Sequence, residues 1–277
     1  MGMQMRKRLS KLAVFAILMF IVVCTFFPYY FMLISSLKNN SEIAAHPFTM
    51  TLPLRFENYT SSYRMILQYL KNSVIVTGCT VAGTSIIAVL SAYVFARFNF
   101  PGKTFLYMFI LSFMMIPSVL TLIPMYVLVS DMGMIGTYLS AILPAIATAQ
   151  IQFIVILVPY IEGLPQDLFD AARLDGANQL QTFFYVTEPL IRATLTSQML
   201  LTFLNSWNDF IWPMLTLSSN KELKTITLGL YSYRDVQQIL YGPMFAGFFM
   251  ASIPLILLFS FNMKHFISGL TTGAVKG

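Results

Sequence analysis

The chain has 277 residues, of which 57% are hydrophobic and only 10% are charged, and its mean hydropathy is +0.72. This composition lies outside the range of soluble globular domains and indicates a polytopic membrane protein in a lipid membrane. The net charge of +6 does not indicate a partner nucleic acid, because the basic residues sit at the boundaries of apolar segments. Cys24 and Cys79 fall within apolar segments and indicate neither a disulfide framework nor a metal site.

The first apolar segment, residues 12–33, follows a basic start between Arg6 and Lys11. It is longer than the core of a cleavable signal peptide, and no small-residue cleavage site closes it. We therefore expect an uncleaved transmembrane helix. A polar loop is expected at residues 38–71. Its Asn58-Tyr59-Thr60 sequence matches a glycosylation sequon, which we discount in a bacterial membrane.

The next three apolar segments are expected to span the membrane at residues 74–95, 105–129 and 138–160. The first of these is rich in small and β-branched residues, which allow helices to approach closely in lipid. Pro117 and Pro124 interrupt the second and predict a kinked helix within a bundle.

The turn between the second and third spans superficially resembles a nucleotide-binding loop at Gly102-Lys103-Thr104. Such a loop needs a glycine five positions before its second glycine, and Arg97 stands there instead. The sequence therefore predicts that this chain binds no nucleotide or other cofactor.

A polar stretch at residues 163–189 interrupts the second half of the chain. Pro165 suits the first turn of a helix, and acidic side chains near that end are favoured by the helix dipole. Leu168, Ala171, Ala172 and Leu174 would form an apolar face, and Asp175-Gly176 would end the helix. Such a short amphipathic helix could insert into a groove of a partner protein or lie in the plane of a membrane interface.

This stretch resembles the cytoplasmic EAA loop of bacterial ABC-importer permeases. The family pattern is Glu-Ala-Ala, three residues and Gly, followed after a longer gap by Leu-Pro. Here Asp170-Ala171-Ala172 precedes Gly176, and Glu188-Pro189 follows. Asp170 keeps the acidic charge on a shorter arm, whereas Glu188 replaces a residue that is usually apolar. The resemblance implies that Asp170, Ala171, Ala172, Leu174, Asp175 and Gly176 couple the chain to an ATPase.

Two further apolar segments, residues 193–212 and 244–263, are separated by a polar loop at 213–242 and bring the predicted spans to six. Six spans place both termini on one side. That side holds ten Lys and Arg residues and the other holds seven in longer loops, so the positive-inside rule predicts cytoplasmic termini and a cytoplasmic coupling loop. We thus expect an all-α polytopic membrane protein with one permease domain over residues 1–277.

Several other stretches resemble the carbohydrate-uptake branch of this family, specifically its maltose-G-like subunit. They are Ser91-Ala92-Tyr93-Val94-Phe95-Ala96-Arg97-Phe98, Ile116-Pro117, Leu122-Ile123-Pro124, Trp207-Asn208-Asp209-Phe210 and the ending Gly269-Leu270-Thr271-Thr272-Gly273. The resemblance extends over nearly the whole chain.

This resemblance implies a heteromeric importer in the bacterial cytoplasmic membrane. Its expected partners are a second, related permease, two cytoplasmic ATPase domains that hold ATP and Mg, and an extracytoplasmic solute-binding protein. The chain itself is expected to be no enzyme. It would form half of the pathway for a sugar or oligosaccharide and couple ATPase motion to alternating access.

Polar residues inside or beside the predicted spans are candidates for the substrate pathway. The candidates with amide, carboxyl or aromatic side chains are Gln150, Gln152, Asn205, Trp207, Asn208, Asp209 and Tyr126. Structural alternatives remain open for several of them. The two glutamines are typical of hydrogen bonds between helices, while Trp207, Trp212 and Asp209 also suit the membrane interface.

Two other classes of function are less consistent with the sequence. A secondary transporter driven by an ion gradient would be expected to carry charged relay residues in mid-membrane, and the spans are almost free of charge. An intramembrane enzyme would need a catalytic constellation. His46 and His265 lie in a loop and at a span's end, without metal-ligand spacing.

Overall fold

The computed structural model describes residues 2–231 and 239–274, whose regular secondary structure is helical, which confirms the prediction of an all-α protein. The chain divides into two compact units. The first contains residues up to Leu67 together with Gly229–Leu255, and the second contains Gln68–Leu228 together with residues from Ile256 onward.

The first unit begins with α1 (Gly2–Ser36), a helix that is apolar along most of its length. Its segment Lys11–Ser36 is long and apolar enough to cross a membrane. Side chains from Leu12 to Tyr30 are exposed around the helix, which suits contact with lipid or another apolar surface. The short helix α2 (Asn40–Ala45) follows.

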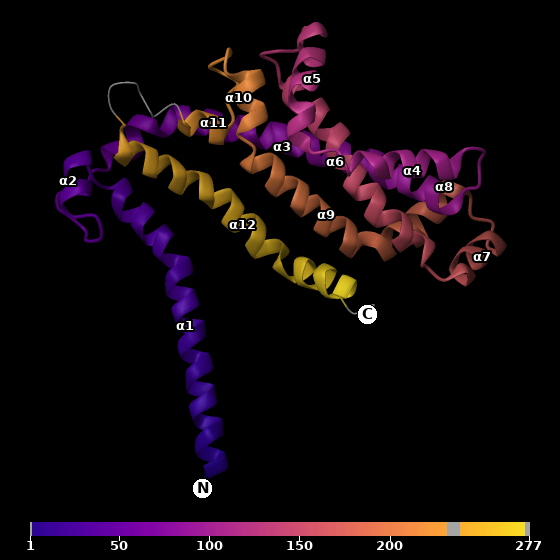
Figure 1. Cartoon of the computed structure of the whole chain (residues 1–277), viewed down its shortest axis with the longest axis horizontal. Helices are drawn as coiled ribbons and strands as arrows, with labels where there is room; N and C mark the ends of the chain where they lie inside the picture. Colours follow the sequence, from indigo (N-terminus) through magenta and orange to yellow (C-terminus); the bar gives the residue numbers. More distant parts are fainter. Residues whose placement is uncertain (1, 232–238, 275–277) are drawn as a thin grey trace. The chain divides into compact units, whose positions relative to one another are not determined.

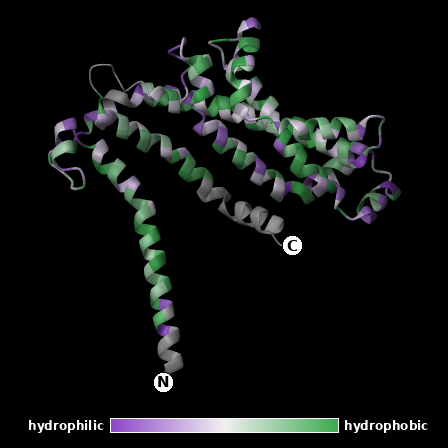
Figure 2. Ribbon diagram, viewed as in Figure 1, coloured by the Kyte–Doolittle hydropathy of each residue, from purple (hydrophilic) through white to green (hydrophobic). Residues whose placement is uncertain are grey.

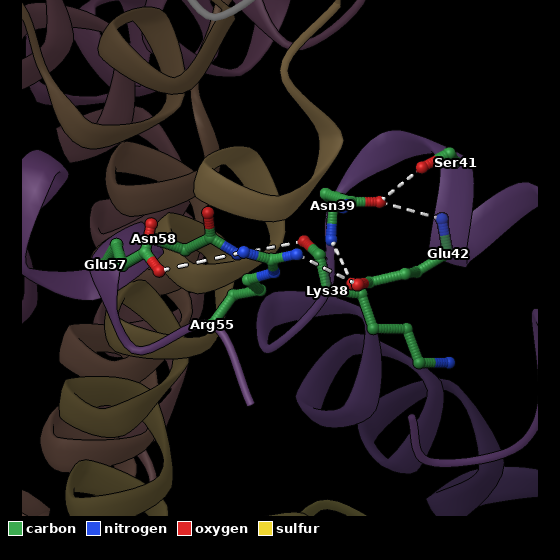
Figure 3. Close-up of polar contacts among 7 residues, drawn as sticks. All are labelled: Lys38, Asn39, Ser41, Glu42, Arg55, Glu57 and Asn58. Carbon is green, nitrogen blue, oxygen red and sulfur yellow. Dashed lines mark hydrogen bonds and ion pairs between the residues drawn. The ribbon is translucent and has the colours of Figure 1, made fainter. Parts of the chain in front are cut away.

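A polar junction connects α1, α2 and the beginning of α3 (Glu57–Arg97) within the first unit (Figure 3). Asn39 and Glu42 form a reciprocal capping box at the beginning of α2. The Asn58 amide donates hydrogen bonds to the backbone carbonyls of Ser36 and Lys38, at 2.8 and 2.9 Å. Lys38 is 1% exposed, and its Nζ donates to the His46 carbonyl at 2.7 Å.

The expected polar loop at 38–71 is therefore shorter than predicted, because α3 already begins at Glu57. The polar residues that suggested a loop satisfy the first turns of this helix and the end of α1. Asn58 carries out such a structural role, since its amide holds two carbonyl groups that α1 and its following turn would otherwise leave unpaired.

The second unit is a helical bundle (Figure 1), whose main core lies between α3 and α6 (Tyr138–Glu162). Its main core contains Ala92 and Phe95 from α3, Leu157 and Ile161 from α6, and Ile191 from the beginning of α9. Its elements after α3 are α4 (Lys103–Phe113), α5 (Ser118–Asp131), α6 (Tyr138–Glu162), α7 (Gln166–Leu174), α8 (Gln179–Thr182), the π-helical turn Phe183–Thr187, α9 (Glu188–Asn208) and α10 (Ile211–Leu217).

The third predicted span is not one kinked helix but two helices, α4 and α5, that meet at 101°. Pro117 explains the position of the break. It has no N–H to donate and it disfavours helical backbone at Ile116, so the helix ends before it and a new one begins at Ser118. Pro124 lies inside α5 without ending it, so the prediction that both prolines break the span was wrong for Pro124.

Four helical segments of the described residues are long and apolar enough to cross a membrane, or five if α4 and α5 count as one span. They include Tyr63–Arg97 of α3, Tyr138–Glu162 and the beginning of α12 (Tyr241–Ala274). Helix α9, at the fifth predicted span, is not among them, because its charged and polar residues, which include Glu188, Arg192 and Gln198, lower its mean hydropathy. A membrane protein with several spans is confirmed, while the count of six stays a prediction.

The predicted polar loop at 213–242 also contains helical structure, since α10 begins at Ile211 and extends into it to Leu217, and α11 (Ile226–Tyr231) follows. Asn72 of α3 connects part of this segment to the bundle. Its amide donates to the carbonyls of Glu222 and Lys224, and its carbonyl accepts from Tyr138 at 2.6 Å. Residues 232–238 of the predicted loop lie outside the described residues.

Candidate functional site: a docking helix and a polar cleft

Helix α7 is the predicted coupling helix, and the structure places it immediately after α6 (Figure 1). Pro165 is the residue before its first turn, one position earlier than the sequence suggested. Hydrophilic residues gather around α7, whereas the long helices of the same unit are mainly hydrophobic (Figure 2). A polar corner on an apolar bundle is a suitable place for contact with a water-soluble partner.

Phe169 anchors α7 to the bundle. Its side chain is 2% exposed, and the Arg97 guanidinium lies 3.5 Å from the centre of its ring. Arg97 also donates a hydrogen bond to Gln166 Oε1 at 2.8 Å, and Gln166 in turn donates to Asp170 Oδ1 at 3.0 Å. The end of α3 therefore holds the first turns of α7 through one buried ring and a chain of polar contacts.

The opposite face of α7 is exposed. Leu168, Ala171 and Leu174 repeat at helical spacing, and the exposed fractions of the two leucines are 41% and 89%. Ala172, which the sequence grouped with them, is half-buried on the side of Phe169. Asp170 is exposed and forms an ion pair with Arg173 at 3.4 Å. Leu168, Ala171 and Leu174 thus form a small apolar surface that the described residues leave uncovered, which we call the α7 outer face.

The bend after α7 depends on a backbone conformation that favours glycine. Gly176 has φ +77°, in the left-handed region, and Asp175 is the last residue before it. The Ala177 N–H then donates to the Ala172 carbonyl at 2.9 Å and closes the helix end. The predicted helix stop at Asp175-Gly176 is confirmed.

Glu188, the unusual residue of the motif, begins α9 after the π-helical turn. Its carboxylate forms an ion pair with Arg192 at 3.0 Å, one helical turn further on. An acidic side chain in the first turn is also favoured by the helix dipole. These two contacts give Glu188 a local structural role that the sequence alone did not explain.

A polar cleft of about 430 Å³ lies in the same unit between α3, α5, α6, α9 and α10. Its hydroxyl, amide and carboxyl side chains are Thr80, Ser118, Thr121, Thr148, Gln152, Thr202, Asn205, Ser206 and Asp209. Trp212 contributes an indole ring, whose N–H donates a hydrogen bond to the Ser140 carbonyl at 2.8 Å. Such a mixture of a few polar groups and apolar walls is typical of sites for small molecules.

The structure brings together Gln152, Asn205 and Asp209 of the predicted pathway residues in this cleft. Gln150 lies in an adjoining, mainly apolar cleft of about 600 Å³, which Gln152 also lines. The Gln150 amide contacts the carbonyl of Ala147 in its own helix at 3.4 Å.

Trp207, Asn208 and Tyr126 do not line either cleft. Trp207 is 2% exposed and stacks on Phe203, with ring centres 5.4 Å apart, so it serves as a core residue. Asn208 is exposed and donates to the Leu204 carbonyl at 2.9 Å. Trp212 is the aromatic residue that sequence reasoning did not select. Its position three residues after Asp209 was the available signal.

Asp209 joins α9 to α10. Its carboxylate accepts a hydrogen bond from the backbone N–H of Trp212 at 3.3 Å, and its backbone carbonyl accepts from the Thr227 hydroxyl at 2.7 Å. The cleft has no lysine, arginine or histidine among the described residues that line it. Asp209 is therefore the one charged group in the wall that these residues form.

The fold and these two features define a helical membrane protein with an exposed amphipathic helix and a cleft inside its bundle. Residues 84–271 match the family described as binding-protein-dependent transport system inner membrane component, and the chain belongs to this family. It is thus an importer permease subunit rather than an enzyme, as predicted, and the ion-gradient-driven alternative is not supported.

Similar proteins extend over almost the whole chain. The arabinooligosaccharides transport system permease protein AraQ of Bacillus subtilis is 32% identical, covering 96% of each chain. The lactose transport system permease protein LacG of Rhizobium radiobacter is 30% identical, covering 98% of each. A solved bacterial ABC transporter involved in import of the acidic polysaccharide alginate shares the fold, with a TM-score of 0.76 and 19% identity over 94% of this chain and 97% of that one.

Proposed function

We propose that this chain forms half of the translocation pathway of an ATP-driven carbohydrate importer in the bacterial cytoplasmic membrane. The carbohydrate class is supported by relatives whose names refer to arabinooligosaccharides, lactose and diacetylchitobiose. A solute-binding protein would deliver the saccharide, and a second permease would complete the pathway. Two cytoplasmic ATPase domains would hold the ATP and Mg.

The α7 outer face is the observation that carries the coupling role. Leu168, Ala171 and Leu174 are exposed on a helix whose other side is fixed by Phe169 and Arg97. A rigidly anchored helix with a free apolar face can enter a groove of a partner and transmit its motion to α6 and α9. Closure of the ATPase domains on ATP would move α7 and switch the bundle between its inward-open and outward-open states.

Purification of the tagged chain from native membranes in mild detergent tests the assembly. We expect a second permease and an ATPase to co-purify with it. A chain that purifies alone, or only with itself, would contradict the importer assignment.

A charge on the α7 outer face tests the docking role. Leu174→Glu places a carboxylate at a position that is 89% exposed, and Leu52→Glu does the same at a position that is 84% exposed in the segment between α2 and α3. We expect Leu174→Glu to reduce ATPase co-purification at least about tenfold, since burial of an unpaired charge is costly. Leu52→Glu should leave it unchanged. Equal retention of the ATPase by both variants would defeat the docking role.

The bend provides an independent test. Gly176→Asp and Gly133→Asp both place a side chain on left-handed backbone, at φ +77° and +68°, and neither position has an atom within 4 Å of the added Cβ. Both should suffer similar strain of about 1–2 kcal/mol. Only Gly176→Asp should uncouple ATP hydrolysis from transport or release the ATPase. Normal coupling in Gly176→Asp would contradict the role of this bend.

A further inference from the structure

The polar cleft between α3, α5, α6, α9 and α10 carries a chemical preference that the family assignment does not supply. Its volume of about 430 Å³ lies within the range of small-molecule sites, roughly 300–1,000 Å³. Gln152 and Asn205 are exposed and bring two amides, each with donor and acceptor atoms. Two amides facing one space suit a ligand with several hydroxyl groups.

Thr80 gives an independent indication of a missing partner. Its side chain is 1% exposed, and its hydroxyl oxygen has no hydrogen-bond partner among the described residues. A buried hydroxyl without a partner is unfavourable, and a ligand in the cleft that it lines would supply one. Thr148, across the cleft on α6, differs from Thr80 because its hydroxyl donates a hydrogen bond to the Pro144 carbonyl in its own helix at 3.0 Å.

Charge distinguishes between ligand classes. Asp209 contributes a carboxylate, and the described residues at the cleft wall include no cationic side chain that would neutralise it. A carboxylate accepts hydrogen bonds from sugar hydroxyls but repels the carboxylates of uronic acids. The Trp212 ring is fixed by its hydrogen bond to the Ser140 carbonyl and is 9% exposed, so it adds a limited apolar surface to the cleft wall.

We propose that this cleft is a binding subsite for a neutral saccharide, in which Asp209, Gln152, Asn205 and Thr80 bind hydroxyl groups, and that it rejects acidic saccharides. This inference rests on the proposed carbohydrate function and adds a contribution of this chain to the choice of substrate. Asp209 accepts a hydrogen bond from a sugar hydroxyl while it keeps the one from the backbone N–H of Trp212.

Protection of a cysteine in the cleft tests the proposal on the permease itself, separately from any choice made by a binding protein. Ala149 is half-buried in the cleft wall and has no polar group to lose. Ala149→Cys would be introduced into the purified importer complex after Cys24→Ser and Cys79→Ser, since both natural cysteines are exposed. The rate of its labelling by a water-soluble maleimide would be measured with a neutral trisaccharide or with a uronic acid trisaccharide.

We expect the neutral trisaccharide to slow labelling about fivefold at about four times its dissociation constant, while the acidic one has no effect. A second reporter, Asn99→Cys in the exposed turn before α4, should label at the same rate with either saccharide. Protection by the acidic trisaccharide that equals or exceeds protection by the neutral one would overturn the proposal.

Variants with matched controls assign the binding groups. Asp209→Asn should weaken protection by the neutral trisaccharide about tenfold or more, and Thr80→Val about fivefold. Asp131→Asn and Thr196→Val make the same chemical changes outside the cleft, on α5 and α9, and should leave protection unchanged. Cleft variants that behave like these controls would also overturn the proposal.

ATP-driven uptake by the importer in proteoliposomes, with its binding protein, separates the two hypotheses. Uptake of a saccharide without any protection of Ala149→Cys would refute the subsite and leave the proposed function intact. Failure to take up any saccharide would refute the carbohydrate function and the subsite with it.

Discussion

At the scale of single residues, Arg97 has a role that its place at a span boundary does not suggest. A basic residue at the end of a membrane helix usually contributes to topology. Arg97 also lies over the Phe169 ring at 3.5 Å and donates to Gln166, so it connects α3 to the beginning of α7. Its guanidinium plane suits both contacts at once, which an ammonium group would not.

Loss of Arg97 should therefore loosen α7. We expect Arg97→Met to reduce the hydrogen-exchange protection of residues 166–174 about five- to tenfold, in line with a cation–π contact and one hydrogen bond. Arg192→Met removes an exposed arginine that pairs with Glu188 in α9 and serves as the control, with α7 protection unchanged. Equal protection of α7 in Arg97→Met and the unaltered protein would contradict the anchoring role.

The polar junction of the first unit should make stability depend on pH. The backbone N–H of Asn39, followed by the Arg55 guanidinium and the charge of Lys38, lowers the pKa of Glu42 below its ordinary value. A lowered folded-state pKa means that the unfolded chain binds more protons as pH falls. The stabilisation is thus present above the ordinary pKa and is lost as pH falls through the lowered one.

Comparison of the unaltered protein with Glu42→Gln checks this dependence. The unaltered protein should have the higher midpoint of thermal unfolding at neutral pH, and the difference should shrink between about pH 5 and about pH 3. Glu57→Gln is the control, because the Glu57 side chain is 79% exposed and its ion pair with Arg55 is long, at 3.9 Å. A difference between Glu42→Gln and the unaltered protein that is independent of pH would refute the assignment.

The cleft shows which residue-level predictions the sequence could support. Gln152, Asn205 and Asp209 stand out as polar residues beside apolar segments, and they meet in one cleft. Trp207 and Trp212 look equivalent in sequence, since both flank Asp209. Only the helix geometry shows which of the two faces the cleft. Trp207 packs on Phe203 inside α9, whereas Trp212 lies in the first turn of α10, after the turn at Asp209.

At the scale of elements, the length of an apolar run predicts a helix well where the helix is apolar throughout. It misses the polar turns by which some helices extend beyond the apolar run. The predicted span 138–160 corresponds to α6, which ends two residues later at Glu162. By contrast, α3 begins 17 residues before the predicted span at residue 74, because its first turns carry polar groups that bond to α1 and its following turn. The sharp break between α4 and α5 could be placed from Pro117, but the angle of 101° depends on packing that the sequence does not express.

The beginning of α12 offers a test of close packing between elements. A Cβ at Gly242 would overlap the Lys38 carbonyl oxygen and the Asn58 amide, so α12 approaches the end of α1 only through glycine. We expect Gly242→Ala to lower the free energy of unfolding by about 1–3 kcal/mol through overpacking. Gly78→Ala in α3 meets no atom within 4 Å and should instead stabilise by about 0.5–1 kcal/mol through helix propensity.

Thermal unfolding of the two alanine variants in detergent measures both effects. Opposite shifts of the unfolding midpoint would support the close approach of α12 to the polar junction. A Gly242→Ala variant as stable as Gly78→Ala would show that this approach is absent.

At the scale of the whole molecule, the chain needs a membrane as its solvent. The most apolar 18-residue window of the segment Lys11–Ser36 in α1 has a mean hydropathy of 2.5, and none of this window is buried against the rest of the chain. Exposure of this extent is costly in water and favourable in lipid. The orientation across that membrane is then set by the distribution of Lys and Arg.

The ten to seven bias of Lys and Arg predicts that the turn before α4 is cytoplasmic and that α2 lies outside. Single cysteines at Asn99 and Ala45, both exposed, would report on these two segments after Cys24→Ser and Cys79→Ser. We expect an impermeant maleimide to label Ala45→Cys in intact spheroplasts and Asn99→Cys only in inside-out vesicles. Labelling of both cysteines from the same side would exclude an odd number of spans between the two positions. Labelling of both in intact spheroplasts would place the turn before α4, and α7 with it, outside the cell, on the side opposite the ATPase.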